Sequence, residues 1–376
     1  MKVAKLLGIT ILAAMTVPSV MATGIKYQND KGQSVNLTGN MQWTYRYTDA
    51  QGKAAVNDIL LRSLRLGTEG SLYENWTGKF QFDLGQGVPV IKDAFVRYDC
   101  CKNCKVTVGN MYMPFSREVL SGSYLQENAA GTTLVGSRDY GTPDRQAGVH
   151  VAGTVLDDKL ALAASACRTV VDPDNSKICF DSIVSPRGTN SDWNLGYMFG
   201  GRIEYAPWGQ VKFSQGDLEK SKKASVAVGA YSWQNDNKNL SSARSNDVDS
   251  VVGVELSGAV RYHGLSVDAE CNLIDSSLKD DGITSGLYKD SETRVVNYAV
   301  EAGYMVLPGQ LEAVLAYESQ DADNYAKTWN RITGGLNYFV KGHDIKYQLS
   351  YTAGQNKGGK ANSDVDEIYL QAQYLF

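Results

Sequence analysis

Three cysteines lie close together in the stretch CCKNCK, at Cys100, Cys101 and Cys104. A C-x-x-C pair can exchange disulfides, bind a metal ion or attach a haem. A covalent haem needs His directly after the second cysteine, where this chain has Lys105, and no second pair for tetrahedral zinc is visible. We therefore predict no metal site and no cofactor, and expect a disulfide between Cys101 and Cys104 across a tight turn. A thiol that contacts a redox partner remains the alternative.

The other cysteines and the histidines suggest structure rather than catalysis. Cys167 and Cys179 flank a loop and are expected to pair in an oxidising compartment, while Cys271 is expected to be a small apolar filler. A hydrolase would need a Ser–His pair with a third group that orients it. The spacing around the chain's 3 histidines suggests no such arrangement, so we predict no catalytic residues and no enzyme.

The elements that position these residues are expected to be strands. Residues 1–22 have the layout of a secretory signal peptide: Lys2 and Lys5, then an apolar run, then small residues up to Ala22. The run is too short to be a comfortable membrane anchor. Beyond it, alternating apolar and polar residues recur in segments of about ten, each followed by a turn. Sixteen such segments are predicted, at residues 34–48, 60–73, 75–85, 90–99, 104–112, 145–155, 159–168, 194–205, 224–234, 250–262, 264–275, 295–306, 310–319, 330–340, 343–354 and 365–376.

The connections between these segments alternate in length. One set is short, as at Glu74 and His263, with only residues 206–223 long, and the other set is mostly long. Outer-membrane β-barrels have this asymmetry, with short periplasmic turns and long extracellular loops. The predicted fold is therefore all-β, a 16-stranded antiparallel transmembrane β-barrel over residues 23–376, in the outer membrane of a Gram-negative cell.

Alternation also predicts which side chains face the lipid. A ring of sixteen strands is too wide for side chains to fill, so the apolar face is expected to face lipid and the polar face a water-filled lumen. In the first segment Met41, Trp43 and Tyr45 would face outward. The chain ends on Phe376 in an alternating segment, which is similar to the signal that outer-membrane assembly machinery recognises.

The same alternation places charged residues in the lumen. The basic candidates for lining the pore are Arg46, Arg65, Lys79, Arg97, Arg202, Arg261, Arg331 and Lys346. The acidic candidates are Glu69, Asp83, Asp93, Glu204, Glu255, Asp268, Glu270, Glu301, Glu312 and Glu318. Because both signs occur, the lumen is expected to orient polar solutes without strongly excluding either ion. The first four basic residues are the best anion-binding strip, unless they only pair with Glu69, Asp83 and Asp93.

Three stretches carry a family resemblance. They are VIKDAFVRYD (residues 90–99), VTVGNMYMPFSRE (106–118) and GGRIEYAPWG (200–209). These stretches resemble motifs of the phosphate-selective porin O and P family. The resemblance implies a homotrimeric outer-membrane porin whose third loop, here residues 113–144, folds into the lumen and narrows it. Arg117 and Arg138 on that loop then become further candidates for lining the pore. Anion-selective members line the pore with arginine and lysine.

Two functions remain open from the sequence. The first is a porin that gives passive diffusion of small polar solutes or anions, with phosphate or other oxyanions as specific candidates. The second is a barrel that forms the sheath or docking component of a periplasm-to-surface electron-transfer assembly, because of the cysteine-rich turn. The chain is mildly acidic, with a formal net charge of −4, and its longest basic run is short, so no nucleic-acid partner is expected.

Overall fold

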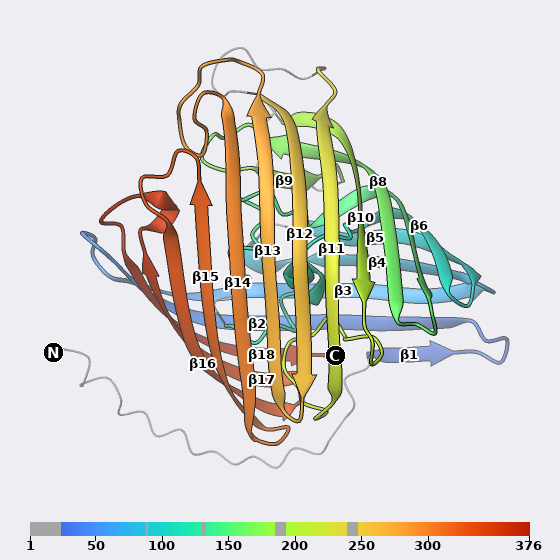
Figure 1. Ribbon diagram of the computed structural model, residues 1–376. Helices are drawn as coiled ribbons and strands as arrows, with labels where there is room; N and C mark the ends of the chain where they lie inside the picture. The colour runs from blue at the N-terminus through green and yellow to red at the C-terminus, as the bar shows by residue number, and fades with distance from the viewer. Residues whose placement is uncertain (1–23, 88, 130–132, 185–192, 239–246) are drawn as a thin grey trace.

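One antiparallel sheet makes up most of the chain. The computed structural model describes residues 24–87, 89–129, 133–184, 193–238 and 247–376. Within them, an 18-stranded sheet contains two short strands, β1 (Ile25–Gln28) and β9 (Cys179–Ser182). The other sixteen close into a ring (18 − 2 = 16), because β8 pairs with β10 and β18 pairs with β2. Figure 1 shows the resulting barrel, and the predicted fold class is confirmed.

Each predicted segment corresponds to one strand of this ring. The strands are β2 (Ser34–Ala50), β3 (Val56–Tyr73), β4 (Trp76–Asp83), β5 (Val90–Cys101), β6 (Cys104–Tyr112), β7 (Arg145–Val155), β8 (Leu160–Asp172), β10 (Asn194–Tyr205), β11 (Lys222–Asn235), β12 (Val248–Tyr262), β13 (Leu265–Leu278), β14 (Glu292–Leu307), β15 (Leu311–Ala322), β16 (Trp329–Lys341), β17 (Ile345–Gln355) and β18 (Val365–Leu375). The predicted signal peptide lies outside the described residues.

The alternating pattern forms the two faces of the barrel. On β2, Trp43 is 46% exposed, whereas its neighbours Gln42 and Thr44 are buried. The exposed residues of the strands are mainly Val, Leu, Ile and Tyr, which suits contact with lipid.

The first and last strands meet at one end of the barrel. Gly39 exchanges two backbone hydrogen bonds with Phe376, of 2.8 and 3.0 Å. Past the point where β18 ends, β1 pairs with residues Ser34 to Leu37 of β2. This is the end with short turns, so the described chain begins and ends on the same side.

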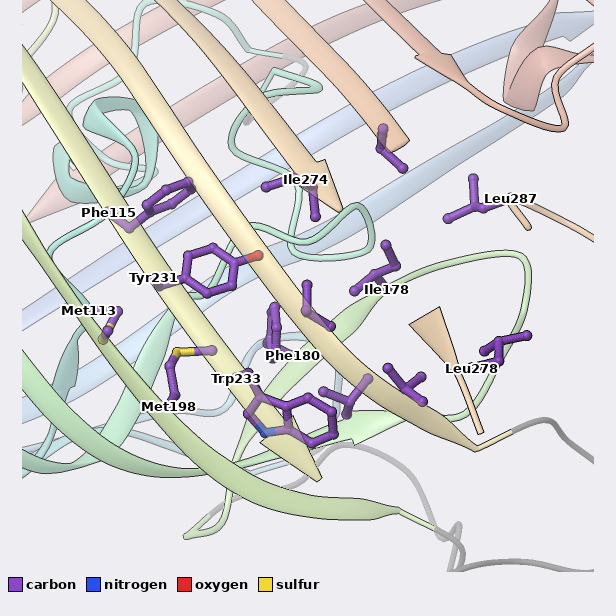
Figure 2. Close-up of a cluster of buried hydrophobic side chains, with 14 of the residues drawn as sticks. Met113, Phe115, Ile178, Phe180, Met198, Tyr231, Trp233, Ile274, Leu278 and Leu287 are labelled. Atoms are coloured by element: carbon purple, nitrogen blue, oxygen red, sulfur yellow. The ribbon is translucent and has the colours of Figure 1, made fainter. Parts of the chain in front are cut away.

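The inner face departs from the expected polar lining. A close-packed apolar cluster inside the ring includes Tyr231 and Trp233 of β11, Ile274 of β13 and Phe180 of β9. Figure 2 shows these side chains converging with Phe115, which lies in the connection between β6 and β7. The prediction of a polar lumen is therefore wrong for the long-loop half of strands β10 to β14. Alternation along each strand correctly identifies which side chains point inward. In this region, however, the inward side chains pack against loops instead of facing water.

The helices of the described residues are short: α1 (Arg117–Ser121), η2 (Gly85–Gly87) and η3 (Lys357–Gly359). None of the helices in the described part of the chain is long and apolar enough to cross a membrane.

Candidate functional site

The connection between β6 and β7, residues 113–144, contacts the inner wall of the barrel. Its amide groups meet carboxylates on the wall. Glu255 of β12 accepts hydrogen bonds from the backbone N–H groups of Ser116 (2.8 Å) and Arg117 (3.1 Å). Glu270 of β13 accepts from the N–H of Glu118 at 2.9 Å. Hydrogen bonds between buried N–H groups and carboxyl oxygens are costly to break, so these acidic residues hold the loop in place.

The carbonyl groups of the same loop meet donors further around the ring. Lys346 of β17 donates from Nζ to the carbonyl oxygen of Gln126 at 2.7 Å, and Gln348 donates to that of Glu127 at 2.8 Å. Gln373 of β18 donates to the carbonyl oxygen of Tyr124 at 2.9 Å. These bonds satisfy backbone groups that would otherwise be buried without partners.

Ten basic residues were predicted to line the pore, and four of them are partly exposed inside the barrel. Their side chains are 37% (Arg46), 27% (Lys79), 26% (Arg97) and 23% (Arg138) exposed. Each lies near a carboxylate: Asp58 at 3.0 Å, Asp93 at 2.8 Å, Asp99 at 3.4 Å and Asp181 at 3.3 Å, respectively. The exposed cations are therefore compensated by negative charge.

Five other candidates are buried among protein atoms. Arg117 pairs with Asp268 at 2.7 Å, and Arg261 pairs with the same carboxylate at 2.7 Å. The remaining buried candidates are Arg65, Arg202 and Lys346. Arg331 is intermediate, with a side chain 14% exposed and 3.5 Å from Glu318. These residues contact the loop or the wall, and little of their charge reaches solvent.

Two of the inward basic residues that were not predicted lie at β-bulges. Between β2 and β3 the register shifts at Arg62, whose Nη1 donates to the carbonyl oxygen of Ala129 at 3.1 Å. Between β4 and β5 it shifts so that Lys92 and Asp93 are both buried. A bulge adds one residue and reverses the parity beyond it, which simple alternation cannot reveal.

The cysteines differ from the sequence prediction at one pair. Cys179 of β9 lies opposite Asp172 of β8, which is five residues along the strand from Cys167 (172 − 167 = 5). At about 3.3 Å per residue this is on the order of 16 Å, too far for a disulfide. The prediction of a Cys167–Cys179 bond is wrong because β9 folds back on β8 as a hairpin that was not foreseen. Both thiols are free and buried.

The cysteine-rich turn lies beside a cavity at the short-turn end. Cys101 and Cys104 face each other across the β5–β6 turn with their thiols free, so their disulfide stays a prediction. Both line a cavity of about 520 Å³ together with Tyr112, Arg202 and Phe213. Among the described residues, no group of three or more His, Cys, Asp or Glu side chains could hold a metal ion.

His343, in the turn between β16 and β17, is partly buried and makes two side-chain hydrogen bonds. Its Nε2 donates to the carbonyl oxygen of Gln215 at 3.0 Å, and its Nδ1 accepts from Lys346 Nζ at 3.3 Å. Burial, helped by the Lys346 ammonium, lowers the pKa of His343 to about 3. The imidazole is therefore neutral, with its proton on Nε2.

Comparison with known proteins agrees with this geometry. A family model described as "Phosphate-selective porin O and P" matches residues 35–376. No curated protein matches the sequence. Among solved structures, the chain is similar to an anion-selective porin from Comamonas acidovorans, with 13% identity, a TM-score of 0.63, and coverage of 92% of this chain and 100% of that one.

Two further structures have the same fold. The outer-membrane protein OmpT of Vibrio cholerae shares 13% identity at a TM-score of 0.61, with 94% of this chain and 100% of that chain covered. The outer-membrane channel DcaP of Acinetobacter baumannii shares 16% identity at a TM-score of 0.55, with 93% and 99% covered. At these identities the likeness establishes the barrel fold, and nothing in it supports the electron-transfer sheath.

Proposed function

The chain belongs to the phosphate-selective porin O and P family and is thus an outer-membrane porin, a passive channel for small polar solutes or anions; from that premise we propose that it is weakly selective and does not bind phosphate specifically. The supporting observation is the pairing of the partly exposed lumen cations. A carboxylate lies within 3.4 Å of each of these four residues, Arg46, Lys79, Arg97 and Arg138. A phosphate site would need cations that carboxylates do not compensate.

The loop at residues 113–144 is proposed to narrow the conducting path. It occupies space inside the ring, bonded to β12 and β13 on one side and to β17 and β18 on the other. Solutes would then pass through the sector where Arg46, Lys79 and Arg97 of β2, β4 and β5 are partly exposed. Both signs of charge line this sector.

Conductance of the purified protein in a planar lipid bilayer tests the proposal. We expect steady open-channel steps, a small reversal potential under a potassium chloride gradient, and a chloride current that millimolar phosphate leaves unchanged. Block by phosphate at that concentration would overturn the claim of weak selectivity. The absence of any current would overturn the proposed path through the barrel.

A homotrimer is proposed as the assembled form. One of the solved OmpT structures is described as a trimer form, and the family resemblance implied the same state. Native mass spectrometry from detergent micelles should give three copies per particle, and a monomer at all concentrations would contradict the proposal.

A further inference from the structure

The connection between β10 and β11, residues 206–221, folds into the barrel although it leaves the short-turn end. Four of its residues are almost fully buried: Ala206 (0% exposed), Val211 (4%), Gln215 (1%) and Asp217 (2%). Asp217 accepts a 2.7 Å bond from the N–H of Gly264 in the β12–β13 turn, which anchors the base of the segment. The sequence identified this connection only as the one long member of the short set.

One side chain of this segment lies among the groups of the loop at residues 113–144. The N–H of Gln215 donates to the carbonyl oxygen of Leu125 at 3.0 Å. Its Oε1 accepts from the N–H of Glu127 at 2.7 Å, and its Nε2 donates to Glu118 at 2.9 Å. Its Nε2 also donates to Glu301 on β14. Three of these four bonds therefore reach the loop from the periplasmic side.

Residues next to Gln215 add contacts to the same loop. Arg117 of the loop donates to the carbonyl oxygen of Lys212 at 3.0 Å, and its guanidinium lies 5.4 Å from the ring centre of Phe213. The wall supports the segment as well, since Arg261 donates to the carbonyl oxygen of Ser214 at 2.7 Å. The periplasmic segment thus connects the wall to the loop.

We propose that Gln215 is a positioning residue for the pore: it fixes the loop at residues 113–144 from the periplasmic side and thereby sets the width of the conducting path. This inference rests on the proposed function, in which that loop narrows the path. The buried side-chain amide satisfies one backbone N–H group and two carboxyl groups, and truncating it leaves the N–H of Glu127 and one oxygen each of Glu118 and Glu301 without this partner. The loop is then free to shift within the barrel.

Single-channel recording of Gln215→Ala tests the inference. We expect a change of roughly twofold in open-channel conductance, with larger current noise, because conductance depends on the narrowest part of the pore. The matched control is Glu219→Gln on the same segment, where the side chain is 67% exposed and pairs only with Lys212 at the surface. That variant should conduct as the unmodified protein does.

The recording distinguishes the possible failures. Only folded, inserted molecules carry current, so poor yield does not obscure the result, and Gln215→Asn serves as a milder variant if the alanine variant gives no channels. Conductance and noise equal to those of the unmodified protein in both variants would overturn the positioning role. If the unmodified protein itself gives no current, the proposed function fails instead.

Discussion

At the scale of single residues, the lumen is defined by ion pairs that are partly open to water. Arg97 is one of them: its side chain is 26% exposed and its Nε lies 3.4 Å from Asp99. Pairs of this kind contribute little to stability, typically about 0–1 kcal/mol. On the proposed path, we expect them to act on passing ions, which would meet both charges at short range. The balance of the two signs is then expected to set the selectivity.

Reversing one charge should shift that balance. In Arg97→Glu we expect the ratio of anion to cation permeability to fall by at least about fivefold, since each unit of charge at about 4 Å in water interacts by about 1 kcal/mol and the substitution changes two units. The reversal potential under a salt gradient measures this. Arg294→Glu is the control, because Arg294 is 62% exposed and alternates with the buried Thr293. Equal shifts in the two variants would place Arg97 outside the conducting path.

The partly buried His343 gives a pH dependence of stability. Its pKa is lowered to about 3, against about 6.5 in an unfolded chain. Between these values the unfolded state binds a proton that the folded state does not, so stability falls as the pH drops from about 6.5 towards 3. At pH 4.5 the loss is about 2–3 kcal/mol. We expect urea unfolding in detergent to show this loss, and His343→Gln to show a smaller one; equal pH profiles would contradict it.

At the scale of elements, alternation predicts the strands well because lipid and lumen impose opposite polarities on successive residues. It fails where a strand departs from strict period two. Arg62 and Lys92 turn inward at bulges, and a bulge has no composition that marks it. Alternation also gives no sign that Tyr231 and Trp233 pack against loop side chains rather than water, because that depends on contacts between segments distant in sequence.

A glycine lies where the first and last strands of the ring meet. A Cβ added at Gly39 would lie 2.3 Å from the Cζ atom of Phe376. The aromatic ring of Phe376 therefore occupies the space that a side chain at position 39 would need. Gly39→Ala should displace that ring and lower stability by roughly 1–3 kcal/mol. We also expect slower barrel assembly, because Phe376 ends the segment that is similar to an outer-membrane assembly signal.

Heat-dependent electrophoretic mobility, which separates folded from unfolded barrels, measures both effects. The control is Gly334→Ala on β16, where an added Cβ meets nothing within 4 Å. Similar unfolding temperatures for the two variants would show that the aromatic ring of Phe376 can move aside for a methyl group at position 39. Its packing against Gly39 would then not be specific.

At the scale of the whole molecule, the barrel is asymmetric: one sector of the lumen is packed with apolar side chains, whereas Arg46, Lys79 and Arg97 keep partial exposure in another. Tyr231 of β11 is central to the packed sector, with Phe115 at 4.8 Å and Phe180 at 5.5 Å between ring centres. Its hydroxyl also donates to the carbonyl oxygen of Gly141. Phe115 and Gly141 lie near the two ends of the loop at residues 113–144, so one side chain holds both.

Removing the aromatic ring of Tyr231 should therefore change both the stability of the barrel and its conduction. In Tyr231→Ala we expect a loss of roughly 3–5 kcal/mol and a noisier open-channel current, because both ends of the loop lose a packing partner. Tyr231→Phe keeps the packing and removes one hydrogen bond, so about 1 kcal/mol should be lost with the current unchanged. Tyr304→Ala is the matched control, since Tyr304 is 57% exposed on the lipid face. A quiet current in Tyr231→Ala, with stability reduced as expected, would mean that the apolar cluster stabilises the barrel without holding the loop.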